Sequence, residues 1–216
     1  MSTTRFNEME IDAIGEIMNI SLGASATTVS TLLGSKVNIT TPVVQVKRKE
    51  EFDFHDLEPA VGVEISYVTG INGKSIMLFS RNDVRIIVST MMGADISAEE
   101  FVMDEINTSA IREVMNQMMG AAATSLSTMT GQKVDISPPH ATLESFLDED
   151  PSKFSSFLTE DFVKISFRME IDGLVDSTLM QLYPIDFAKS LYDTLIMDTS
   201  SSKTNPSTTP VSQPQN

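Results

Sequence analysis

The sequence predicts one α+β domain made of two related halves, and three observations support this expectation. Residues 8–42 return as residues 105–139 at a constant offset of 97, and the two segments share 17 of 35 positions, where ordinary composition would give roughly two or three. Six segments have the composition of strands, and two more have the periodicity of short helices. We therefore expect a six-stranded, mainly antiparallel sheet with two long helices, two shorter helices and internal pseudo-twofold symmetry.

The first half begins with the first of the long helices. Apolar residues start to recur at helical spacing near Asn7 or Glu8, and Gly34 provides a typical helix end. In the next strand Pro42 marks an edge or a bend, because proline cannot donate a ladder hydrogen bond. In chain order the expected elements are a helix at 8–34, a strand at 36–48, an acidic turn-like segment at 50–59, strands at 60–68 and 74–80, and a helix at 82–92.

The second half repeats this order after a connector at 93–104. Its expected elements are a helix at 105–130, a strand at 133–144, an acidic loop with several Phe residues at 145–161, strands at 163–171 and 174–183, and a helix at 186–195. The repeats thus span about 8–95 and 105–195 within a domain at 1–198. Residues 199–216 are rich in Ser, Thr, Pro, Gln and Asn, which predicts a disordered linker. Since both long helices must bury their apolar faces against shared strands, neither half is expected to fold alone.

Composition narrows the classes of function. The formal net charge of −15 opposes binding to nucleic acid or to anionic lipid. The chain has no Cys, which excludes a disulfide framework and a cysteine nucleophile. It shows neither a signal peptide nor a run of 18 apolar residues, so we expect a cytoplasmic protein without membrane insertion. A protein partner or a small molecule is the favoured ligand.

The polar residues retained in both copies mark the candidate site. On a helix that turns 100° per residue, positions 12, 16, 19 and 23 fall within about 60° of one another and form one stripe, opposite a buried apolar side. The second helix repeats the stripe and its apolar side. The stripe residues are Asp12, Glu16, Asn19 and Gly23 in the first copy, and Ser109, Glu113, Asn116 and Gly120 in the second.

Several chemistries compete for this stripe. Two Glu residues could form an acid and base pair for glycoside hydrolysis, but the chain has no Trp and few other aromatic residues to line a sugar cleft. A metal site is disfavoured because no His lies in the stripe, and His55 and His140 fall in expected loops. A merely solvated helix face remains open as the plain alternative. The Met residues clustered near 91, 92, 115, 118 and 119 are expected to fill the core.

The retained residues follow one spacing: Asp or Ser, three residues, Glu, two residues, Asn, then 22 residues and Pro, ending at Pro42 or Pro139. This pattern resembles the CheC, CheX and FliY family of bacterial chemotaxis phosphatases. The resemblance covers about residues 8–195 and is greatest to the FliY group of flagellar switch proteins, through runs such as NISLGASATTVSTLLGSKVNITTP and VDSTLMQLYP. It implies a CheC-like fold and hydrolysis of the phosphoryl-aspartate on the response regulator CheY.

The resemblance also implies roles for single residues. Asn19 and Asn116 would each orient the attacking water, one per site, and Glu16 and Glu113 would pair with a lysine of the CheY receiver domain. The domain would need no cofactor of its own, because the Mg²⁺ would be supplied by CheY. The remaining pattern residues would support the contact or shape the neighbouring strand; they are Asp12, Ser109, Pro42 and Pro139.

The resemblance further implies a setting for the domain. The expected partners are phosphorylated CheY and the flagellar switch proteins FliM, FliG and a FliN-like domain, at the cytoplasmic face of the flagellar basal body. The linker at 199–216 would lead to the FliN-like domain, which this chain lacks. The alternative function is a non-catalytic scaffold of the switch complex that resembles the middle domain of FliM.

Overall fold

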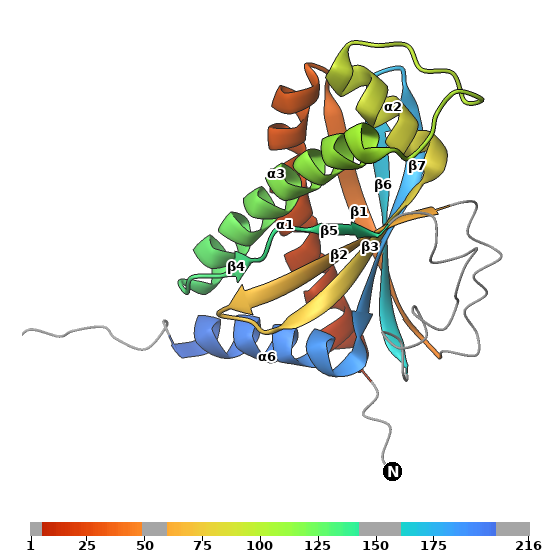
Figure 1. Ribbon diagram of the computed structural model, residues 1–216. Helices are drawn as coiled ribbons and strands as arrows, with labels where there is room; N and C mark the ends of the chain where they lie inside the picture. The colour runs from red at the N-terminus through yellow and green to blue at the C-terminus, as the bar shows by residue number, and fades with distance from the viewer. Residues whose placement is uncertain (1–5, 49–59, 143–160, 202–216) are drawn as a thin grey trace, which may run out of the picture.

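The structure is a computed structural model that describes residues 6–48, 60–142 and 161–201 (Figure 1). The predicted acidic segment at 50–59 and nearly all of the one at 145–161 lie outside these residues. So do His55 and the tail from residue 202. In the described part the elements are α1 (Glu8–Leu33), β1 (Val37–Lys47), β2 (Ala60–Thr69), β3 (Gly73–Ser80), α2 (Arg81–Met92), α3 (Glu105–Thr130), β4 (Asp135–Ile136), β5 (His140–Thr142), β6 (Phe162–Ile171), β7 (Val175–Pro184) and α6 (Ile185–Ser201).

All strands belong to one antiparallel sheet, whose order reflects the duplication. The order is β1-β6-β7-β3-β2-β4, and β5 also pairs with β2. β1 of the first half thus pairs with β6 of the second, while β4 and β5 of the second half pair with β2 of the first. The two central hairpins meet where β3 pairs with β7. The predicted α+β class, antiparallel sheet and pseudo-twofold symmetry are confirmed, and each half lends its first strand to the other.

The strand predicted after α3 differs from the structure. The strand expected at 133–144 is interrupted, and only the short strands β4 and β5 form. Pro138 and Pro139 lie between them, and neither can donate a ladder hydrogen bond. The loop position expected for His140 is wrong, because this residue begins β5 and pairs with Glu64 of β2.

The last helix is longer than its sequence pattern predicts. The pattern ends at Leu195, but α6 continues to Ser201. The first residues of the predicted linker, 199–201, are therefore helical, because Ser and Thr weaken a helix only slightly.

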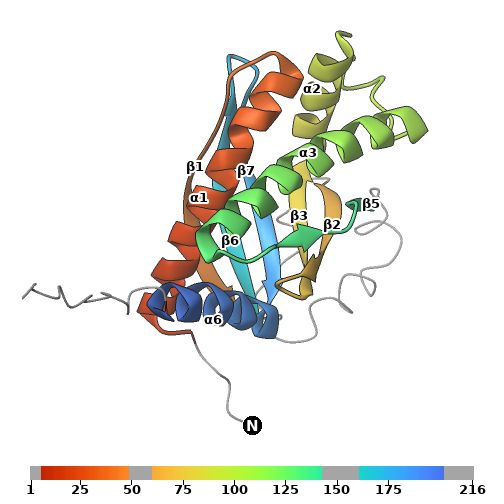
Figure 2. The same ribbon diagram turned by 90° about the vertical axis from the view of Figure 1, so that its left-hand side faces the viewer.

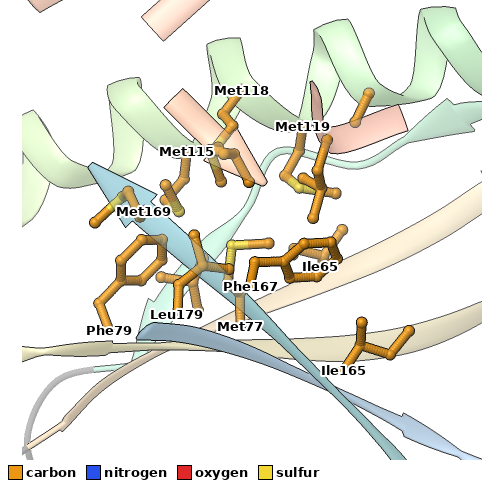
Figure 3. Close-up of a cluster of buried hydrophobic side chains, with 14 of the residues drawn as sticks. Ile65, Met77, Phe79, Met115, Met118, Met119, Ile165, Phe167, Met169 and Leu179 are labelled. Atoms are coloured by element: carbon orange, nitrogen blue, oxygen red, sulfur yellow. The ribbon is translucent and has the colours of Figure 1, made fainter. Parts of the chain in front are cut away.

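The long helices α1 and α3 lie against each other over one face of the strongly twisted sheet, with α2 and α6 at opposite ends (Figures 1 and 2). Figure 3 shows the core beneath α3, where Met115, Met118 and Met119 project toward Phe79 and Phe167 of the sheet. These five side chains are at most 2% exposed. The core role predicted for the clustered Met residues is confirmed for these three. It is wrong for Met92, which is 48% exposed.

Candidate active site

Capping side chains define the first residue of both long helices. At the start of α1 the side chain of Asn7 accepts a hydrogen bond from the backbone N–H of Glu10 at 2.9 Å, and the Glu10 carboxylate accepts one from the backbone N–H of Asn7 at 2.7 Å. This reciprocal capping box satisfies two of the free N–H groups at the helix start. In α3 the carboxylate of Asp104 caps the N–H of Asn107 at 2.8 Å.

The first stripe lies on the outer face of α1, as its spacing predicts. Asp12 and Glu16 are exposed, and Asn19 is half-buried. Ile14, Ile17 and Met18, on the opposite side of the helix, are 1%, 5% and 2% exposed. Because the apolar side is buried against the sheet, the carboxylate and the carboxamide are presented to solvent one turn apart.

The second stripe lies on the outer face of α3 with the same spacing. Ser109, Glu113 and Asn116 are all exposed. The side-chain amide of Gln117 donates a hydrogen bond to the Glu113 carboxylate at 2.9 Å. At the equivalent position of α1 stands Ile20, which is 42% exposed, so the surroundings of the two Glu residues differ.

The two stripes are separated by the crossing of their helices. At the crossing the hydroxyl of Ser21 donates a hydrogen bond to the backbone carbonyl of Ala122 at 3.2 Å, and small side chains allow this close approach. With a rise of about 1.5 Å per residue, Asn19 lies about 3 Å along its helix from this contact and Asn116 about 9 Å. No hydrogen bond or ion pair joins the two stripes in the described part of the chain.

The prolines of the pattern lie in the strands behind the helices and not on the stripes. Pro42 is half-buried in a bulge of the edge strand β1, where the register with β6 shifts between Thr40 and Val43. Pro139 is buried between β4 and β5. Both prolines thus stand where the first strand of each half is interrupted, and the edge or bend predicted at Pro42 is confirmed.

A buried polar cluster lies beneath the first stripe. The hydroxyl of Tyr183 donates to the sulfur of Met18, the residue before Asn19, at 3.5 Å. The amide of Gln181 donates to the hydroxyl of Ser75 at 3.1 Å. Burial raises the pKa of Tyr183 and, although hydrogen bonds oppose it, that of Tyr67. The cluster is closed to solvent and so supports α1 rather than forming part of the exposed site.

The side chains of each stripe are suited to positioning a water molecule and a partner. A carboxamide can donate to and accept from the same water molecule, and an exposed carboxylate can accept from a cationic partner group. Within the described residues no three His, Asp or Glu side chains gather as a metal site would require. The helices of the described part include none that is long and apolar enough to cross a membrane. Arg112 and Gln117 flank the second stripe, and their counterparts in the first copy are Gly15 and Ile20.

Comparisons with known proteins match both the sequence and the fold. A model of the CheC-like family matches residues 9–46 and 106–143, which contain the two stripes and prolines. Over 192 residues, 88% of this chain, the sequence is 45% identical to the flagellar motor switch phosphatase FliY of Bacillus subtilis. The chain spans about half (50%) of the length of that relative.

The solved structures that share the fold include those of a FliY and of a FliM protein. The crystal structure of Thermotoga maritima FliY is 33% identical, with a TM-score of 0.75 over 89% of this chain and 98% of that one. The middle domain of FliM from H. pylori is 14% identical, with a TM-score of 0.65 over 88% of this chain and 99% of that one. At this identity the FliM match concerns the fold alone.

Proposed function

Because this chain belongs to the CheC-like family, confirming the resemblance seen in its sequence, we propose that it is a phosphatase of the flagellar motor switch. Its substrate is the phosphoryl-aspartate of the chemotaxis response regulator CheY. The observation that carries the proposal is the pair of outward-facing stripes, each with a Glu and an Asn one turn apart. The phosphatase named FliY in Bacillus subtilis supports the reaction class, and the substrate follows from the resemblance of the retained pattern.

The reaction requires water to attack phosphorus in line with the bond to the aspartate oxygen. That bond breaks as the new P–O bond forms, so the products are a free aspartate carboxylate and inorganic phosphate, which takes up the proton of the water. Such transfer depends mainly on positioning and on stabilising charge. Asn19 and Asn116 hold the water by donating and accepting hydrogen bonds. The Mg²⁺ that supports the chemistry is held by the CheY partner.

Glu16 and Glu113 orient the two proteins. Each carboxylate is exposed one turn before its Asn, so it can accept a charge-assisted hydrogen bond from a lysine of the receiver domain. The exposed side chains of Asp12 and Ser109 lie at the edge of each contact. The prolines act at a distance, by shaping the strand behind each helix.

Mixing the purified domain with Mg²⁺ and phosphorylated CheY from the same organism tests the proposal. Phosphate release is compared for the wild type, Asn19→Ala, Asn116→Ala and the double variant. We expect acceleration by the wild type, partial loss in each single variant and complete loss in the double. A folded double variant with full activity would refute the assignment of both Asn residues.

A non-catalytic scaffold of the switch complex is the second candidate, favoured by the fold shared with the FliM middle domain. That likeness does not explain why Glu and Asn recur at the same spacing on the outer face of both helices. A folded wild type that binds switch proteins but never accelerates phosphate release would favour the scaffold.

A further inference from the structure

The two sites differ most at one position beside the retained pair. Arg112 lies on α3 three residues after Ser109 and four residues before Asn116, so its side chain adjoins theirs on the helix surface. It is exposed. The equivalent residue of α1, at the offset of 97, is Gly15. The α3 stripe therefore has a cationic side chain one turn before its Asn, where the α1 stripe has a glycine.

Arg112 has no partner within the described part of the chain, although the protein carries a net charge of −15. Three other arginines have partners within the protein. Arg81 donates to the carbonyl of Phe101, and Arg85 donates to the side chain of Asn82 and the carbonyl of Ile96. Arg168 donates to Asp176 and forms an ion pair with Glu170. No acidic residue stands three or four positions from Arg112 on its helix. Its guanidinium is thus free to meet an anion from outside.

The surroundings of positions 15 and 112 differ because the strands beside the two helices differ. A Cβ atom added at Gly15 would lie 3.4 Å from Cγ2 of Val44 in β1. This side of α1 faces an edge strand that pairs with β6 along most of its length. In the second half the equivalent strand is reduced to β4 and β5. The side chain at 112 is exposed, whereas one at 15 would start in van der Waals contact with Val44.

Resting on the proposed function, we propose that Arg112 is a substrate-binding residue of the second site that contacts the phosphoryl oxygens of the aspartyl phosphate. A guanidinium matches the geometry and the charge of a phosphoryl group. The Cβ atoms of residues four positions apart on a helix lie about 5–6 Å from each other. The long side chain of Arg112 can therefore reach a phosphoryl group that is held beside Asn116. At the first site α1 itself offers the same dianion no Lys or Arg, because residues 8–33 contain neither.

The test isolates each site by removing the Asn of the other. In the Asn19→Ala background only the α3 site remains, and there we expect Arg112→Gln to lower kcat/KM for phosphorylated CheY about tenfold, mainly through KM. Arg112→Lys should restore part of the loss, because it keeps the charge but not the bidentate geometry. In the Asn116→Ala background, Arg112→Gln should leave the remaining activity unchanged. Gln is close to Arg in helix propensity, so the fold should be unaffected.

A binding measurement separates a phosphoryl contact from a general surface contact. Arg112→Gln should weaken binding of CheY carrying the phosphoryl mimic beryllofluoride and leave binding of unmodified CheY unchanged. Equal weakening of both forms, or an unchanged KM in the Asn19→Ala background, would overturn the proposal while leaving the phosphatase intact. An inactive Asn19→Ala variant beside an active wild type would overturn it too. A wild type that fails to accelerate phosphate release would refute the proposed function and this inference together.

Discussion

Replacing Gly23 and Gly120 with Ala should stabilise the fold. Both glycines lie within the long helices, on the stripe one turn after each Asn. Apart from the adjoining backbone of its own helix, a Cβ atom added at either meets no atom within 4 Å. Glycine in a helix interior loses more backbone entropy on folding than any other residue. Nothing in the fold therefore requires glycine at these two positions.

The size of the gain follows from helix propensity. Each replacement should raise the free energy of unfolding by about 0.8–1.0 kcal/mol. Neither added Cβ atom has a neighbour from another element within 4 Å, so we expect the effects to add to about 2 kcal/mol. For a chain of this length that corresponds to a rise in Tm of roughly 4–8 °C.

Urea unfolding and calorimetry of the single and double variants measure the gain. The matched control is Gly34→Ala at the end of α1, where the backbone φ is 63°; a side chain is strained there and the variant should lose about 1 kcal/mol or more. Loss of stability in both Gly23→Ala and Gly120→Ala would refute the reasoning. If the proposed function is correct, the rate of phosphate release should fall although stability rises. Each added methyl group would stand between CheY and the neighbouring Asn and so hinder their contact.

Two further predictions concern the core. Gly73→Ala should cost about 2–3 kcal/mol of unfolding free energy, because the new Cβ atom would overlap the ring of Phe187; urea unfolding measures this cost, and a neutral result would contradict the packing of α6 on the β2–β3 turn. Stability should also fall in alkali, because the pKa values of buried Tyr67 and Tyr183 are raised in the folded state. Their contribution is fully present below about pH 10 and is lost as pH rises through the folded-state values. Unfolding free energies between pH 8 and 11.5 should decline less steeply in a Tyr67→Phe/Tyr183→Phe variant.

The sequence predicted what local signals and internal comparison can reveal. The caps at Asn7 and Gly34 set the bounds of α1, and the duplication alone identified the two stripes. The sequence pattern did not reveal that the strand after α3 would be reduced to β4 and β5, because the interruption depends on how the segment pairs with β2 on either side of Pro138 and Pro139. The proposed role of Arg112 was not predicted from the sequence, for a different reason. A search for retained residues cannot find a side chain that only one copy possesses.

The exchange of first strands has a consequence for how the two sites are maintained. β1 packs against α1 of its own half, yet the strand with which it pairs in the sheet is β6 of the second half. β4 and β5 follow α3, yet they are held by β2 of the first half. Removing either half would therefore leave the other with an unpaired hairpin and a displaced helix, so each site depends on strands from both copies. The sites can diverge at flanking positions such as 15 and 112, but their helices must fold together.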